Sequence, residues 1–229
     1  MPHVGNDIVD LTDSASKKKS RNTRFLNRVF TPDEKSVILS SAFPDLLLWA
    51  LWAAKEAAYK AISKEFPDIP SIPRLFPVFL DPHDSADFPP ESRIIPFSGY
   101  STGTVLTPEG TCWIRIDYRP ACLHCVAFTD VPDHLISSWR VHYLFAPRQT
   151  ASSPESEAVR LASRLHLAGF LEKKFEDLEI IRGNDGHSQA PPRVICQGRP
   201  LDVDISLSHH GLFIAHACLK HYGDSSLSP

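Results

Sequence analysis

The sequence predicts an α+β protein in which two fused, diverged α+β halves pair as a pseudo-dimer. Apolar residues make up 42% and charged residues 22% of the 229 residues, a globular composition that can bury a sizeable core. A long helical pattern occurs early in the chain, and a pattern of paired strands occurs twice. We place the first half at 1–132, the second half at 133–221 and a disordered polar tail at 222–229.

Two apolar strand pairs suggest the duplication. The first comprises 113–119 and 122–129, and the second comprises 204–208 and 212–217. Between the pairs, the sequence predicts an opening strand, an amphipathic helix, a further strand and a turn, at 139–145, 155–171, 177–181 and 197–200. The alternative is a single domain with a long insertion. The proline-rich segment 67–96 is expected to be an extended loop, and 147–154 a linker.

The early helix spans 46–62 and consists of strong helix formers without internal glycine or proline. One of its sides carries two indoles, a carboxylate and an ammonium at steps of three and four: Trp49, Trp52, Glu56 and Lys60. A carboxylate beside buried indoles needs a cation or a hydrogen-bond donor. A metal ion or Lys60 could serve, and the alternative is an ordinary Glu–Lys pair on a solvated helix face.

A short N-terminal strand at 5–11 carries two further carboxylates, Asp7 and Asp10. Because strand side chains alternate between faces, these two acids project to opposite sides and only one can join a given site. Asp7 lies within the strand, whereas Asp10 lies at its exit, where aspartate often closes a turn. Asp7 and Glu56 could together hold one hard cation such as Mg²⁺. The alternative is an aspartate that binds nearby backbone amides.

The hairpin near the C-terminus combines hydroxyls with imidazole. Ser206 and Ser208 share one strand face, and His209 follows at the rim. All three side chains can donate hydrogen bonds to a phosphate. A merely polar hairpin tip is the alternative.

Four blocks in order resemble the 4'-phosphopantetheinyl transferase superfamily, and within it the holo-acyl-carrier-protein synthase type: 5–11, 24–34, 52–60 and 206–209. The resemblance implies an enzyme that moves the phosphopantetheine arm of coenzyme A onto a serine of an acyl or peptidyl carrier protein. It implies Mg²⁺ as cofactor and release of adenosine 3',5'-bisphosphate. The chain is about twice as long as the trimeric synthases, which is consistent with the fused halves. A monomer is then expected rather than a trimer.

The resemblance also implies roles for the acids and lysines. Asp7 and Glu56 match the metal ligands, and Asp7, Glu56 and Lys60 are the expected catalytic residues. Lys55 and Lys60 match the lysines that lie near the phosphates of coenzyme A. Either Glu56 or a metal-bound water could be the general base.

The resemblance further implies that the blocks at 206–209 and 24–34 contact the substrate and the carrier protein, respectively. Ser208 and His209 match the pair that contacts the phosphate end of the nucleotide. Arg24 and Arg28 match the helix that faces the acidic carrier protein, and they end a basic stretch that begins at Lys17. The carrier could belong to fatty-acid biosynthesis, polyketide synthesis or peptide synthesis.

Composition argues against several other classes. The net charge of −3 and the absence of a recognition motif argue against nucleic-acid binding. No apolar run has the roughly 18 residues of a membrane span, and the N-terminus has no signal-peptide pattern. Five irregularly spaced cysteines argue for a reducing, cytoplasmic compartment. The Cys122–Cys125 pair has no second pair at zinc spacing, so buried thiols are expected there.

Three alternatives to the transferase interpretation remain. The first is a non-catalytic carrier-protein-binding pseudoenzyme, against which the presence of both carboxylates and both lysines argues. The second is a different magnesium-dependent nucleotide enzyme, although no Walker A pattern occurs in the sequence. The third is a structural α+β protein whose acids form salt bridges.

Overall fold

The computed structural model describes residues 1–82, 99–131, 135–144, 154–182 and 190–220. Most of the predicted linker 147–154 and the predicted tail 222–229 lie outside these residues. Among the described residues, no helix is long and apolar enough to span a bilayer.

Within the described residues, ten strands form two five-stranded antiparallel sheets. The order in the first sheet is β1 (Val4–Asp10), β5 (Cys122–Phe128), β4 (Gly110–Tyr118), β3 (Gly99–Thr107) and β2 (Val78–Leu80). The order in the second sheet is β6 (Ile136–Tyr143), β10 (Phe213–Lys220), β9 (Arg199–His210), β8 (Pro192–Cys196) and β7 (Leu178–Arg182). The predicted α+β class is confirmed, and both predicted strand pairs are present.

The two sheets share one topology. In each sheet the first strand in sequence is an edge strand, and the last strand pairs beside it. In each half, a long helix follows the first strand: α3 (Pro44–Ile62) after β1 and α4 (Pro154–Phe170) after β6. The chain changes sheets between Phe128 and Ile136. This correspondence supports the interpretation that the chain consists of two diverged copies.

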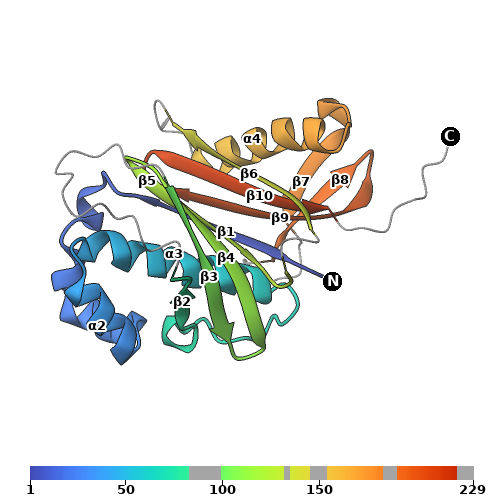
Figure 1. The fold of residues 1–229 in the computed structure, drawn as a ribbon. Coiled ribbons are helices and arrows are strands. Elements are labelled where there is room, and N and C mark those ends of the chain that lie inside the picture. The colour runs from blue at the N-terminus through green and yellow to red at the C-terminus, as the bar shows by residue number, and fades with distance from the viewer. Residues whose placement is uncertain (83–98, 132–134, 145–153, 183–189, 221–229) are drawn as a thin grey trace.

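The elements stack as four layers, with the helices outside and the sheets between them (Figure 1). The core under α3 is the largest, and a smaller core lies between α4 and the second sheet. Two apolar clusters between the sheets contain Val4 and Ile8 of β1 together with Ala217 and Phe213 of β10. The two halves are therefore joined by a continuous apolar interface beside β1.

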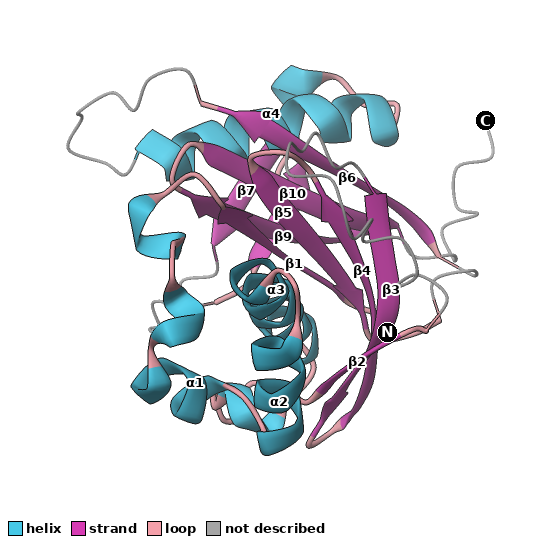
Figure 2. Cartoon of the chain, turned by 60° about the vertical axis from the view of Figure 1, so that its left-hand side comes forward, coloured by secondary structure: helices cyan, strands magenta, loops and turns pink. Residues whose placement is uncertain are grey.

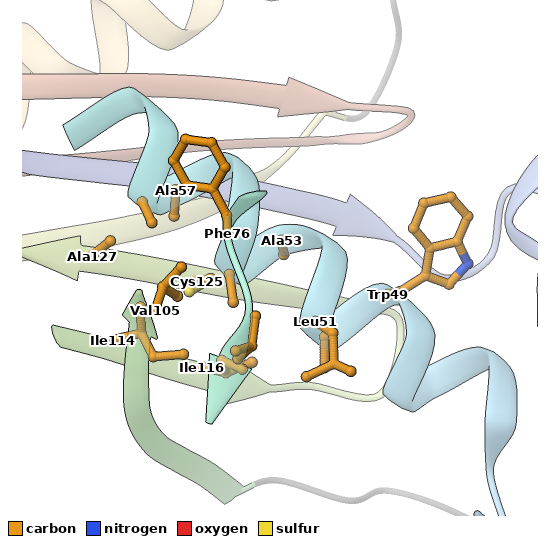
Figure 3. Packing of buried hydrophobic residues seen from close by; sticks show 14 of the residues in the cluster. Trp49, Leu51, Ala53, Ala57, Phe76, Val105, Ile114, Ile116, Cys125 and Ala127 are labelled. Atoms are coloured by element: carbon orange, nitrogen blue, oxygen red, sulfur yellow. The ribbon is translucent and has the colours of Figure 1, made fainter. Parts of the chain in front are cut away.

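Alanines allow α3 to lie close against the first sheet. Ala53, Ala57 and Ala61 are fully buried, and the helix crosses the sheet beside Val105, Ile114 and Ile116 (Figure 3). Small side chains shorten the distance between the helix axis and the sheet, so side chains on β1 and on α3 can meet at the rim of this contact.

Two short helices precede α3 and pack beside it: α1 (Thr23–Val29) and α2 (Pro32–Ser40) (Figure 2). A capping box begins α2, in which Thr31 and Glu34 exchange hydrogen bonds between side chain and backbone. The expectation of an extended loop at 67–96 is wrong at β2, and its part at 83–96 lies outside the described residues. Val78–Leu80 pair with β3 because the chain leaving η3 (Pro73–Leu75) runs along the free edge of that strand.

Buried histidines predict acid sensitivity. Burial lowers the pKa of His124 and of His216 to about 3, from an ordinary value of 6.5, and the neighbouring His166 adds to the effect on His216. The unfolded chain therefore binds more protons below pH 6.5, so stability is lost as pH falls from 6.5 towards 3. We expect each histidine to lower the free energy of unfolding by about 2 kcal/mol between pH 7 and pH 5.

Urea titrations at the two pH values would measure this loss. A His216→Gln variant should lose less stability than the wild type over the same range. An equal loss in both proteins would contradict the assignment of the acid sensitivity to this histidine.

Candidate functional site

Asp7, Glu56 and Lys60 come together where β1 meets α3. Alternation along β1 directs the Asp7 side chain towards α3, on which Glu56 and Lys60 lie one turn apart. The Lys60 Nζ atom donates to Asp7 Oδ1 at 2.7 Å and to the Asn6 carbonyl oxygen at 3.0 Å. The ammonium thus holds the strand and its carboxylate against the helix.

Glu56 experiences an unusual electrostatic environment. Burial raises the pKa of its carboxyl above the usual range, the negative charge of Asp7 raises it further, and Lys60 opposes both effects. No described residue donates a hydrogen bond to the Glu56 carboxylate. Two acids within electrostatic reach, one of them without a donor, form a site that favours an additional cation.

The donor set of this site fits a hard divalent cation with few protein ligands. The described residues contain no cluster of three or more potential histidine, cysteine, aspartate or glutamate ligands. Two carboxylates are what Mg²⁺ commonly takes from a protein when water and substrate phosphates complete its shell. With both acids ionised and Lys60 charged, the cluster keeps one net negative charge, which a cation would neutralise.

Asp10 lies on the opposite face of β1, as the alternation predicts. Its carboxylate accepts from the Leu212 amide at 3.0 Å and from the Thr12 amide at 2.8 Å. Although burial raises the pKa of Asp10, these hydrogen bonds lower it overall. Asp10 therefore fastens the tip of the β9–β10 hairpin to the end of β1 and does not join the acidic site.

Lys55 is not brought to the site. It precedes Glu56, and successive helical residues point about 100° apart, so its ammonium lies on the core side of α3. Its Nζ atom is 2.7 Å from Glu34 Oε1 and donates to the Phe76 carbonyl at 2.7 Å. Only 1% of the Lys55 side chain is exposed. This geometry gives Lys55 a structural task, holding α2 and the segment before β2 against α3.

A Lys55→Met substitution is accordingly expected to act on stability. It would leave the buried Glu34 carboxylate without its cation, and breaking such a pair costs about 3 kcal/mol. Urea unfolding should show this loss. A Lys55→Met protein as stable as the wild type would contradict the structural role of this ion pair.

Ser208 and His209 point to opposite sides of β9. The Ser208 hydroxyl is buried and accepts from Asn6 Nδ2 at 2.9 Å, beneath β1. His209 lies near the exposed end of the strand. Partial burial of its ring lowers its pKa, and the charge of Lys60 lowers it further, while Glu155 opposes the shift. His209 is thus within electrostatic reach of the acidic site, whereas Ser208 serves the contact between the halves.

Arg24 and Arg28 are exposed on α1 and make no salt bridge within the described residues. Phe25, between them in sequence, packs against Trp52 with ring centroids 5.6 Å apart. Trp52 lies one turn before Glu56 on α3. The basic helix therefore stands next to the acidic site and is connected to it through an aromatic contact.

Sequence interpretation missed a further largely buried charge of this region, Lys64. Its ammonium donates to the Val4 and Ile205 carbonyls at 2.6 and 2.7 Å, and to both oxygens of Asp204 at 2.8 Å. Burial lowers the pKa of Lys64, and Asp204 opposes that shift. The available signal was its spacing of four residues from Lys60, although Lys64 lies just beyond the end of α3.

Comparisons with known proteins find relatives of the first part of the chain. Residues 3–95 match the sequence profile described as the 4'-phosphopantetheinyl transferase superfamily. A holo-[acyl-carrier-protein] synthase of Protochlamydia amoebophila is 41% identical over 63 residues, which are 28% of this chain and 52% of that protein. The synthases of Chlamydia caviae and Chlamydia felis are 37% and 34% identical over 60 and 62 residues, covering 26% and 27% of this chain and 49% and 51% of their own.

The chain spans about half the length of the curated relatives it matches. The matched segment contains β1 and α3, the two elements that present Asp7, Glu56 and Lys60. Residues 3–95 are therefore similar to the 4'-phosphopantetheinyl transferase superfamily, as the ordered sequence blocks predict.

Proposed function

We propose that the protein transfers the 4'-phosphopantetheine arm of coenzyme A to a serine of an acyl or peptidyl carrier protein. The observation that supports this most is the meeting of Asp7, Glu56 and Lys60 between β1 and α3. The names of the matched synthases and the superfamily profile support the same reaction.

In this reaction the serine oxygen forms a bond to the β-phosphorus of coenzyme A. The bond from that phosphorus to the bridging oxygen breaks, so adenosine 3',5'-bisphosphate leaves with the electron pair. The Glu56 carboxylate can accept the serine proton. Lys60 uses two of its three donors on Asp7 and Asn6, which leaves one for the charge that develops on the leaving phosphate.

Asp7 and Glu56 would hold Mg²⁺. When bound, the ion supplies positive charge against the diphosphate oxygens. The chain itself contributes orientation: Lys60 holds Asp7 in place, and the packing of α3 against β1 keeps the two carboxylates within electrostatic reach. His209 would contact the phosphate end of the nucleotide, a contribution to binding rather than to turnover.

Intact-protein mass spectrometry of an apo-carrier protein tests the proposal. Incubation with the enzyme, coenzyme A and MgCl₂ should add the mass of one phosphopantetheine arm and release adenosine 3',5'-bisphosphate. Carriers of fatty-acid, polyketide and peptide-synthetase type should be tried in parallel. Binding of a carrier without any mass change across the three types would support the pseudoenzyme alternative instead.

The basic helix α1 would dock the carrier. Because carrier proteins are acidic, replacing Arg24 and Arg28 by glutamate should weaken carrier binding at least about tenfold, and added salt should weaken wild-type binding. Turnover at saturating carrier should change little. The matched control replaces Arg193 and Arg199, which are exposed on the second sheet, by glutamate. Equal carrier affinity in both double variants would remove α1 as the docking face.

A further inference from the structure

The outer edge of β1 is closed by side chains instead of by another strand. Three of its outward amides donate to second-half side chains: Val4 to Asp204 Oδ2 at 2.7 Å, Asn6 to Ser206 Oγ at 2.9 Å and Asp10 to His210 Nδ1 at 3.0 Å. The three acceptors lie on β9, each 200 positions later in the chain than its donor. The second half therefore holds the strand that presents Asp7.

Asn6 is the centre of this contact. It is fully buried, and its backbone amide donates to Ser206 while its carbonyl accepts from Lys60 Nζ. Its side-chain amide donates to Ser208 Oγ at 2.9 Å and lies 3.1 Å from His124 Nε2. Burial lowers the pKa of His124 to about 3, so its ring is neutral near pH 7 and can accept this hydrogen bond.

Asn6 also borders two members of the acidic site. It directly precedes Asp7 in β1, and its carbonyl is one of the two acceptors that orient the Lys60 ammonium. Any rotation of the Asn6 peptide would move this carbonyl away from Lys60 and change where Asp7 projects. Hydrogen bonds from both sheets oppose such a rotation.

We propose that Asn6 is a positioning residue of the transfer site, through which Ser206, Ser208 and His124 set the placement of Asp7 and Lys60. The expected loss of kcat rests on the proposed function. The expected placement of Asp7 and Lys60 by Asn6 does not. The geometry of the acidic site beside the first sheet then depends on residues of both sheets.

Steady-state kinetics provides the first test. Asn6→Ala should lower kcat about tenfold and leave the KM for coenzyme A within about twofold, because the lost interaction acts on site geometry. In a Lys60→Met background the same substitution should have no further effect on kcat. Val194→Ala, which removes buried volume in the second half, controls for lost stability. The proposal would be overturned if Val194→Ala lost as much kcat as Asn6→Ala. It would also be overturned if Asn6→Ala lowered kcat as much in the Lys60→Met background as in the wild type.

A crystal structure of the variant provides a test that does not require activity. In Asn6→Ala the Lys60 Nζ atom should leave its 2.7 Å contact with Asp7 or its 3.0 Å contact with the residue 6 carbonyl. If both contacts were unchanged in the variant, the proposal for Asn6 would be overturned. A wild-type protein that transfers nothing would instead contradict only the proposed function. If Asn6→Ala does not fold, Ser208→Ala removes one partner of the amide and should give the same displacement and the same kcat loss.

Discussion

A Glu56→Gln variant is expected to transfer phosphopantetheine about 100 to 1000 times more slowly than the wild type, with the KM for coenzyme A changed much less. Glutamine keeps the size of the side chain but removes its charge and its ability to accept the serine proton. Asp7 would then face the substrate diphosphate as the single carboxylate of the site. The loss should therefore appear in kcat, measured by the rate of mass gain of the carrier protein.

Two comparisons sharpen this prediction. Glu65→Gln makes the same chemical change on an exposed glutamate just beyond the end of α3 and should leave kcat unchanged. His209→Ala should raise the KM for coenzyme A while sparing kcat, because the ring lies at the rim and contributes to binding. Equal reductions of kcat in Glu56→Gln and His209→Ala would contradict this division of roles.

Gly5→Ala is expected to cost more than about 4 kcal/mol of stability, or to prevent folding. A Cβ atom at this position would lie 1.9 Å from the Ala57 carbonyl oxygen and 2.7 Å from the Ala61 amide nitrogen. Both atoms belong to the α3 backbone, so the clash cannot be relieved by rotating a side chain. The helix would have to move away from β1, which would also separate Glu56 from Asp7.

A glycine in the other half offers a matched control. Gly169 lies near the C-terminal end of α4, and a Cβ atom added there meets nothing within 4 Å. Because alanine is the better helix former, Gly169→Ala should stabilise the protein by up to about 1 kcal/mol. Urea unfolding of both variants tests the pair, and a Gly5→Ala protein of wild-type stability would contradict the close helix–strand contact.

Periodicity alone predicted β1, α3 and the residues that meet at the centre of the site. The strand rule separated Asp7 from Asp10, and the helical repeat placed Glu56 and Lys60 on one side of α3, as the structure shows. The same two rules, applied to neighbours in sequence, would have separated Lys55 from Glu56 and Ser208 from His209. The resemblance to a family motif led us to group these neighbours, although adjacent residues in a helix or strand point apart.

Other features depend on contacts that no local pattern contains. Lys55 is buried because Glu34, 21 positions earlier in the chain, reaches it from the capping box of α2. Lys64 is buried because β9 supplies Asp204 and the Ile205 carbonyl, about 140 positions later. The role of Asn6 likewise follows from the docking of β9 against the edge of β1. The Lys55–Glu34 contact arises from the packing of α2 against α3 within the first half. The contacts of Lys64 and Asn6 arise from the pairing of the halves, which the sequence suggested without giving the register.

The most direct test of the central claim is the binding of Mn²⁺, as a paramagnetic substitute for Mg²⁺, followed by electron paramagnetic resonance in the presence of coenzyme A. The account predicts that the wild type binds one ion per chain and that a protein carrying both Asp7→Asn and Glu56→Gln binds none, although it remains folded. Equal binding of the ion by the wild type and by this double variant would contradict the account.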